Sequence, residues 1–221
     1  MKKDGFVFIS DFDGTLSTKD FYQMMMDKYL GEEGVRLFKA WRAGEYLDKD
    51  FLGIIYSSIN RSEEEIMEDI LEITFEEGAL EFIRKVKNLG GEFVILSAGT
   101  SYYIERILKE YHIEDITLFS NPGIYRDRGI HLQIDKDSRF YSERYGIDKA
   151  KVVEEYKEKY NLVFYAGDSQ PDIAPSKVAD IAFAKPELVQ MLEKENIPCI
   201  PISSFIDIEA YLVKEGLLHG C

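Results

Sequence analysis

The sequence predicts an α/β fold, in which a doubly wound parallel sheet carries an inserted helical segment. Short, wholly apolar blocks at residues 6–9, 93–96 and 162–165 are typical of strands that are buried on both faces. Amphipathic helical patterns separate these blocks, and this alternation of strands and helices favours a parallel sheet. The segment 17–77 breaks the alternation, since it contains helical patterns and no convincing strand.

The remaining elements follow the first strand in alternating order. A helix is predicted over residues 78–89, where apolar side chains form one stripe before a Gly-Gly pair ends it. A second helix is predicted over residues 101–111, and a third begins after Asp148, a residue suited to cap it. Alternating apolar and polar side chains at residues 130–134 predict a hairpin. Two shorter apolar blocks also predict strands, at residues 116–119 and 181–183.

The helical insertion is expected to form a separate small domain. Residues 17–77 would make a helical cap, and residues 1–16 and 78–221 would make the α/β core domain. Within the insertion, residues 62–65 have the spacing of a capping box. Asp48 is expected to cap an earlier helix of the same segment.

Charge and composition exclude several classes of partner. The chain has 221 residues, 45% of them hydrophobic, and a formal net charge of −14. Such an acidic protein is expected to bind nucleic acid and anionic membrane surfaces poorly. No apolar run approaches the length of a membrane span. Cys199 and Cys221 are the only cysteines, so we expect a cytoplasmic protein without a disulfide framework, either a monomer or a homodimer.

The sharpest chemical signal is the run Asp11-Phe12-Asp13-Gly14-Thr15-Leu16, which follows the first predicted strand directly. Two carboxylates two residues apart in extended backbone point the same way. The carboxyl end of a strand is also where open α/β sheets bind ligands. The alternative is that Asp11 and Asp13 only form a turn, because Asp-Gly is a common turn dipeptide.

Polar residues also follow two other predicted strands. The run Ser97-Ala98-Gly99-Thr100 offers a hydroxyl and amides at the start of a helix, which suits an anion. The run Gly167-Asp168-Ser169-Gln170-Pro171-Asp172 adds two carboxylates, and Mg²⁺ prefers hard oxygen ligands. Lys149 starts the preceding helix, where its ammonium can screen a carboxylate–phosphate pair, and Lys151 is its close competitor. Caps, turns and surface charge explain each feature alone, but the ordered set at corresponding strand ends indicates one active site.

This ordered set resembles the four motifs of the haloacid dehalogenase superfamily of phosphohydrolases. The residues that carry the resemblance are DFDGTL at 11–16, ILSAGT at 95–100, Lys149, and GDSQPD at 167–172. The likeness extends from Phe6 to about Phe183 and is greatest to the phosphoserine phosphatase-like branch. It implies a Rossmann-like core with a helical cap inserted after the first motif, and a phosphatase activity.

The resemblance also implies a two-step, magnesium-dependent mechanism. Asp11 would attack phosphorus to form an aspartyl phosphate, and Asp13 would serve first as general acid and then as general base. Mg²⁺ would be held by Asp11, by the backbone carbonyl of Asp13 and by Asp168, with support from Asp172. The phosphate-binding residues would be Thr15, Ser97, Ala98, Gly99 and Lys149. Asp13 favours phosphate esters over halides, since a halide leaves without a proton.

The cap is expected to choose the substrate, a small phosphorylated metabolite. Asp20 falls where phosphoserine phosphatases carry an acidic residue that meets the substrate ammonium. Gly53 falls where they carry the arginine for the substrate carboxylate. This pair looks more similar to the phosphatases of methionine salvage that act on a diketo-methylthiopentane phosphate. Those relatives often carry a cysteine-rich stretch where this chain has residues 139–145, so the substrate stays open among small phosphomonoesters.

Other functions are compatible with a related core. A phosphomutase or phosphotransferase would use the same groups, with a sugar hydroxyl in place of water. A phospho-receiver domain also forms an aspartyl phosphate, but Asp13 and the helical insertion speak against it. A non-catalytic binding protein is the last alternative, although every expected catalytic side chain is present.

Overall fold

The fold is built around a sheet whose central strand comes from the first apolar block of the sequence. The structure is a computed structural model, and it describes residues 3–113 and 115–217. Strand β1 (Lys3–Ser10) lies between β8 (Tyr160–Gly167) and β2 (Glu92–Thr100), in the order β10-β9-β8-β1-β2-β3. Pairing of β1 with both neighbours, and of β9 with β8 and β10, is parallel. The edge strands are β3 (Thr117–Asn121) and β10 (Ile200–Pro201), and β9 (Ile181–Ala184) lies between β8 and β10. The predicted α/β class is confirmed.

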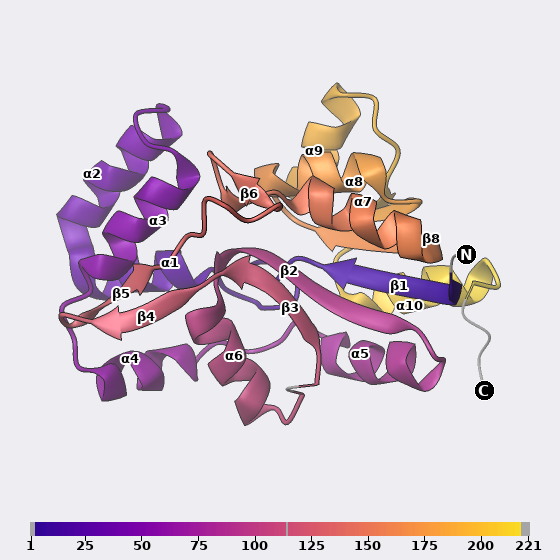
Figure 1. The fold of residues 1–221 in the computed structure, drawn as a ribbon, viewed down its shortest axis with the longest axis horizontal. Coiled ribbons are helices and arrows are strands. Elements are labelled where there is room, and N and C mark those ends of the chain that lie inside the picture. Colours follow the sequence, from indigo (N-terminus) through magenta and orange to yellow (C-terminus); the bar gives the residue numbers. More distant parts are fainter. Residues whose placement is uncertain (1–2, 114, 218–221) are drawn as a thin grey trace. The chain divides into compact units, whose positions relative to one another are not determined.

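Helices cover both faces of the sheet around β1 and β8. Helices α5 (Ala79–Asn88) and α10 (Phe205–Lys214) contact each other on one face, and α7 (Lys149–Lys159) and α8 (Ile173–Val178) contact each other on the opposite face (Figure 1). Helix α9 (Pro186–Lys194) packs against β9. This is the two-sided covering that explains why the strands are apolar throughout.

A row of phenylalanines lines the face of the sheet beneath α5 and α10. The register pairs Phe8 with Phe93 on β2 and with Phe164 on β8. Both rings stack on that of Phe8, with centroids at 5.6 and 6.1 Å. Phe82 from α5 and Phe205 from α10 pack against the same ring, at 4.7 and 6.4 Å. Because β1 is held at its centre in this way, the position of the residues that follow it is well defined.

The chain divides into two compact units, and their boundaries differ from those predicted. One unit comprises residues 1–18, 75–96 and 149–221, and the other comprises residues 19–74 and 97–148. Residues 19–74 of the helical insertion thus group apart from β1. Residues 97–148, which the sequence assigned to the core domain, group instead with the helical insertion.

Hydrogen bonds within the second unit give the physical reason for this grouping. The tip of the hairpin formed by β4 (Gly123–Arg126) and β5 (Gly129–Leu132) lies at the loop before α4 (Glu63–Ile70). There the N–H of Arg61 donates to the carbonyl of Arg128 at 2.9 Å. The guanidinium of Arg128 donates to Asn60 Oδ1 at 3.0 Å. The hairpin predicted at residues 130–134 is confirmed, but its role in fixing the helical insertion was not foreseen.

The helices of the second unit follow from local sequence signals. Ser62 Oγ accepts from the N–H of Glu65 at 3.2 Å, and the Glu65 carboxylate accepts from the N–H of Ser62 at 2.8 Å, which confirms the capping box. Asp48 is the first helical residue rather than a cap, and its carboxylate accepts from Arg144 Nε at 2.7 Å. The helices are α1 (Phe21–Met25), a π-helical turn (Met26–Leu30), α2 (Gly31–Arg42), α3 (Asp48–Ser57), α4 (Glu63–Ile70) and α6 (Ser101–Glu110).

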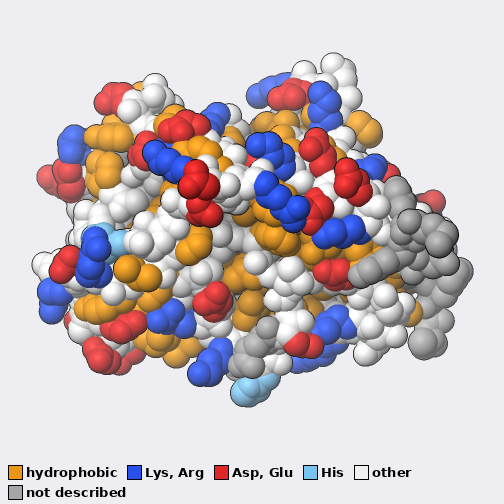
Figure 2. Space-filling view, viewed as in Figure 1, with side chains coloured by type: hydrophobic (Ala, Val, Ile, Leu, Met, Phe, Trp, Pro, Cys, Tyr) orange, Lys and Arg blue, Asp and Glu red, His pale blue; other side chains and the backbone are white. Residues whose placement is uncertain are grey.

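Charged side chains of both signs are found on the surface (Figure 2). On the face seen in Figure 2, Lys and Arg side chains are interspersed with Asp and Glu side chains. Within residues 3–113 and 115–217, no helix is long and apolar enough to cross a membrane. Cys199 is a free, half-buried thiol, and Cys221 lies outside the described residues.

Candidate active site

A tight turn directly after β1 positions the first pair of carboxylates. The N–H of Asp11 donates to the carbonyl of Ala166 at 2.9 Å, so the pairing of β1 with β8 continues up to Asp11. The carbonyl of Phe12 then accepts from the N–H of Ser17 at 2.8 Å, and Gly14 adopts a φ of +74° that glycine tolerates best. Asp11 is thereby fixed and buried, whereas Asp13, two residues further on, is half-buried.

Lys149 joins two carboxylates that come from different strands. Its ammonium donates to Asp11 Oδ1 at 2.5 Å and to Asp172 Oδ1 at 2.7 Å. The Lys149 side chain is 3% exposed, so these bonds form away from bulk water and are only weakly screened. Lys151, the competing candidate, is exposed.

Both carboxylate oxygens of Asp172 accept hydrogen bonds. Its Oδ1 accepts from Lys149 and from the hydroxyl of Tyr165, the latter at 2.6 Å. Its Oδ2 accepts from the N–H groups of Asp168 and Ser169 at 3.0 and 3.2 Å. A carboxylate has about four lone-pair sites, and all four are used here. Asp172 therefore shapes the loop after β8 and holds Lys149, and it is poorly suited to bind a metal directly.

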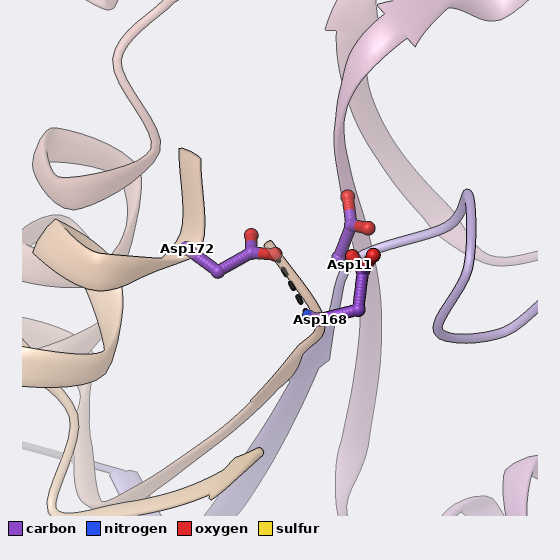
Figure 3. A group of neighbouring side chains, drawn as sticks. All are labelled: Asp11, Asp168 and Asp172. Atoms are coloured by element: carbon purple, nitrogen blue, oxygen red, sulfur yellow. Dashed lines mark hydrogen bonds between the residues drawn. The ribbon is translucent and has the colours of Figure 1, made fainter. Parts of the chain in front are cut away.

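The carboxylates of this site are close enough to share a cation. Asp11, Asp168 and Asp172 each bring one oxygen within 4.8 Å of the others. Figure 3 shows that the side chains of Asp11 and Asp168 converge, while Asp172 approaches from the next helical turn. The hydroxyl of Thr15 donates to Asp168 Oδ1 at 3.4 Å, so Thr15 is directed at a carboxylate. The donor set consists of hard oxygens, which fits Mg²⁺.

Burial dominates the electrostatics of Asp11. Burial raises the pKa of the Asp11 carboxyl, the Lys149 ammonium lowers it, and the carboxylates of Asp172 and Asp13 raise it; together these effects bring the pKa to about 7. The two adjacent anions raise the pKa of Lys149 despite its burial, because the ion pairs outweigh desolvation. The folded protein without metal thus holds a proton on Asp11 that the unfolded chain loses near pH 4. The contribution of Asp11 to stability therefore falls as the pH rises from about 4 to about 7.

Cation binding should depend on pH through this carboxyl. A divalent cation binds the ionised form of Asp11, so at pH 6 a proton must leave first. With a pKa of about 7, only about a tenth of Asp11 is ionised at pH 6. We expect the affinity for Mg²⁺, measured by calorimetry, to be roughly tenfold lower at pH 6 than at pH 8. Asp11→Asn should remove most of that difference, and an unchanged pH dependence in this variant would assign it to another group.

The predicted phosphate-binding run lies at the end of β2, in the second unit. Ser97, Ala98 and Gly99 belong to the strand itself, which continues to Thr100 rather than ending at Leu96. The N–H of Gly99 donates to Ser97 Oγ at 2.9 Å, and the hydroxyl of Thr100 accepts the N–H of Tyr102 as the cap of α6. The strand register pairs Ile95, two residues before Ser97, with Ser10, the residue before Asp11.

The remaining predicted residues also belong to the second unit. Asp20 precedes α1 with extended backbone, and its carboxylate forms no capping bond to that helix. Gly53 lies inside α3, where an added Cβ would meet nothing within 4 Å. Of the predicted residues in the first unit, Asp11, Thr15, Lys149, Asp168 and Asp172 are joined by hydrogen bonds or by shared proximity.

Two residues of the site were missed by the sequence analysis. Tyr165 reads as an ordinary apolar strand residue, yet its hydroxyl bonds to Asp172. Gly167 was quoted in the run 167–172 without a role of its own, but an added Cβ there would lie 2.5 Å from the Cβ and Cγ of Asp172. The apolar block at residues 162–165 gave no signal for the role of the tyrosine, because the sequence does not show which group a buried hydroxyl will bond.

Gly167→Ala should test how tightly Asp172 is held. The methyl group would displace the Asp172 side chain, and overpacking of this kind costs about 1–3 kcal/mol of unfolding free energy. Urea denaturation at pH 7 measures that loss, with Gly53→Ala as the control because its added methyl meets no atom within 4 Å. Equal unfolding free energies of the two variants would mean that the loop after β8 accommodates the added methyl group without loss of stability.

Comparisons with known proteins show which family and relatives the chain is similar to. Residues 8–175 match the model of the family described as haloacid dehalogenase-like hydrolase. The chain is 24% identical over 207 residues to the 2-hydroxy-3-keto-5-methylthiopentenyl-1-phosphate phosphatase of Exiguobacterium sp. strain AT1b, covering 92% of this chain and 95% of that protein. It is 25% identical over 215 residues to the protein of the same name from Bacillus pumilus, covering 95% and 91% of the two chains.

Solved structures match over nearly the full length. A substrate-bound phosphoserine phosphatase complex superposes with a TM-score of 0.71 at 24% identity, covering 96% of this chain and 99% of that chain. A phospho-aspartyl intermediate analogue of phosphoserine phosphatase gives a TM-score of 0.70 at 23% identity, covering 95% and 99%. At these identities the likeness establishes a shared fold.

Proposed function

The chain belongs to the haloacid dehalogenase-like hydrolase family, and on that premise we propose that it hydrolyses phosphate monoesters of small metabolites through an aspartyl phosphate on Asp11. The observation that carries the proposal is the position of the Asp11 carboxylate. It is buried at the carboxyl end of the central strand, held through Oδ1 by Lys149, and within 4.8 Å of Asp168. A turn-forming aspartate would have no need of a buried cation or of a second carboxylate.

In the first step an oxygen of Asp11 attacks phosphorus, and the bond between phosphorus and the ester oxygen breaks. Asp13 gives its proton to the departing oxygen, so the product leaves as an alcohol. Asp13 suits this role because it is half-buried and close enough for its charge to act on Asp11. The products of this step are the alcohol, an acyl phosphate on Asp11 and an ionised Asp13.

In the second step Asp13 acts as a base. It takes a proton from water, whose oxygen attacks phosphorus and breaks the bond to Asp11. Inorganic phosphate leaves, Asp11 returns as a carboxylate, and Asp13 is protonated again. The two steps therefore balance, and the net reaction consumes one water for each ester.

Charge is the main obstacle to both steps, because an anionic nucleophile must meet an anionic phosphate. Mg²⁺, held by Asp11, the backbone carbonyl of Asp13 and Asp168, would screen that repulsion and stabilise the charge of the transition state. Lys149 supplies a fixed positive charge beside Asp11. We propose that the Ser97 hydroxyl and the N–H of Ala98 bind the phosphoryl oxygens, while the N–H of Gly99 is donated to Ser97 Oγ and orients that hydroxyl.

The substrate is proposed to be a small metabolite that needs no arginine at position 53. Gly53 has no side chain to meet a substrate carboxylate, which weakens the case for phosphoserine. The relatives named above as 2-hydroxy-3-keto-5-methylthiopentenyl-1-phosphate phosphatases make that enol phosphate a natural member of any substrate panel. Asp20 keeps an ammonium-bearing substrate among the alternatives.

The test is phosphate release from a panel of esters, with Mg²⁺ and with chelator. The panel contains phosphoserine, sugar phosphates, nucleotides, pyridoxal phosphate, the methylthiopentenyl phosphate and a generic aryl phosphate. Metal-dependent release from one member far above the rest supports the reaction and names the substrate. A dependence on a bisphosphate activator would indicate a mutase, and no release from any member would overturn the proposed hydrolase.

A further inference from the structure

A buried asparagine outside every recognised motif connects two segments of the second unit. Asn121 is the last residue of β3, and it is 2% exposed. Its Nδ2 donates to the carbonyl of Ala98 at 2.8 Å and to the carbonyl of Tyr145 at 2.9 Å. Because both neighbours are carbonyl oxygens, which only accept, the amide nitrogen must be the atom that faces them. Both of its hydrogens are thereby used.

The first of these bonds acts on the run at the end of β2. The carbonyl of Ala98 and the N–H of Gly99 belong to one peptide group. Asn121 holds that group by its oxygen, and Ser97 Oγ holds it by its nitrogen at 2.9 Å. A planar peptide fixed at both ends cannot rotate, so the directions of the Ser97 hydroxyl and of the adjoining amides are set together.

The second bond reaches the turn between β6 (Tyr141–Ser142) and β7 (Gly146–Ile147). This turn is itself anchored on α3, where the N–H of Lys49 donates to the carbonyl of Arg144 at 3.0 Å. The Arg144 side chain pairs with Asp48 at 2.7 Å. Asn121 therefore ties the end of β2 to a turn that is already fixed at its other side.

Close packing leaves Asn121 a single position. Gly146 has a φ of +79°, and an added Cβ there would lie 2.2 Å from Asn121 Oδ1. The absence of a side chain at position 146 is what lets the carboxamide sit between the two carbonyls. The bonds and the close approach together point to a site built for an amide.

We propose that Asn121 is a positioning residue, which orients the run Ser97–Gly99 for binding the phosphoryl group. The inference rests on the proposed function, since it assigns a task to that run. Asn121 itself touches neither phosphate nor metal. It acts by holding the Ala98–Gly99 peptide, and its loss should weaken phosphate binding without removing any catalytic group.

Two variants, each with the same number of side-chain heavy atoms as asparagine, test the hydrogen bonds of Asn121. Asn121→Leu removes both donors, and Asn121→Asp replaces the amide with a carboxyl that faces two carbonyl oxygens. We expect kcat/KM for the aryl phosphate to fall by about a hundredfold in both variants at pH 8, and the inhibition constant of inorganic phosphate to rise about tenfold. Hydrogen exchange at the Gly99 amide, followed by NMR, should accelerate at least about tenfold.

A pH series distinguishes the proposed role from a merely structural one. The carboxyl introduced by Asn121→Asp regains one donor when it is protonated, and its pKa should be high because it is buried beside two acceptors. The ratio of kcat/KM for Asn121→Asp to that of the wild type should therefore rise as the pH falls from 8 to 5.5, whereas the same ratio for Asn121→Leu should stay flat. Taking ratios cancels the pH dependence of the reaction itself.

Ile66→Ala provides a control for general destabilisation, because Ile66 is fully buried in α4 and its truncation makes a cavity in the same unit. At a matched loss of Tm it should leave the inhibition constant of phosphate unchanged. The inference is overturned if Asn121→Asp keeps wild-type phosphate inhibition and Gly99 exchange, or if Ile66→Ala reproduces its defects. A wild-type chain that neither turns over an ester nor binds phosphate would instead overturn the proposed function, and this inference with it.

Discussion

Asp11→Asn is expected to abolish turnover while leaving the fold intact. The amide oxygen of asparagine is a poor nucleophile, so no acyl phosphate forms, and loss of a covalent catalyst of this kind typically costs about 10⁴-fold or more in kcat. Steady-state phosphate release with the best panel ester measures the effect. Acid-quenched wild-type protein incubated with labelled ester should carry phosphate on a carboxyl group, and the variant should carry none.

The stability of Asp11→Asn separates loss of chemistry from loss of structure. Burying an amide costs less desolvation free energy than burying a carboxylate, and Lys149 keeps its second partner, Asp172. We therefore expect the Tm at pH 8 to be equal to that of the wild type or higher. Asp27→Asn, at an exposed position of the second unit, is the matched control and should change neither activity nor Tm. Turnover that survives in Asp11→Asn would exclude Asp11 as the nucleophile.

The sequence predicted those residues of the site whose positions are set by the ends of the parallel strands. Asp11, Asp168 and Asp172 follow β1 and β8, and adjacent parallel strands bring their carboxyl ends together without further information. It left the choice between Lys149 and Lys151 open, although helical periodicity contains the answer. Lys149 precedes the buried Val152 and Val153 by three and four positions, which places it on the buried face.

What the sequence could not predict depends on contacts between distant segments. Residues 97–148 join the helical insertion because of bonds such as that of Arg128 to Asn60, and no local pattern encodes such a pair. Asn121 is a single amide in a stretch without a motif. Its proposed role depends on two backbone carbonyls that lie next to it only in the folded chain. Periodicity indicates which face of a helix or strand is buried, but it does not indicate which polar group of another segment that face will contact.

Lys149→Met is the substitution expected to cost most in stability. Methionine fills a similar volume, but Asp11 and Asp172 lose the cation that compensates their burial. Breaking a buried ion pair by removing one partner costs about 3–5 kcal/mol of unfolding free energy. Because the pKa of Asp11 is about 7, the penalty should grow from pH 6 to pH 8 as Asp11 ionises. Urea denaturation at both pH values, without metal, measures this difference.

The same substitution should lower activity, because Lys149 is the fixed positive charge beside Asp11, the proposed nucleophile. Removing one preorganised group of this kind typically costs about 10²–10³-fold in kcat. Lys151→Met is the matched control two residues away, and its exposed side chain predicts a change in stability within about 0.5 kcal/mol and no loss of kcat/KM. A large defect in Lys151→Met with a silent Lys149→Met would reverse the assignment of the lysine. Loss of stability in Lys149→Met with full activity in its folded fraction would instead limit Lys149 to a structural role, since a charge that acts on the transition state cannot be removed without a cost in rate.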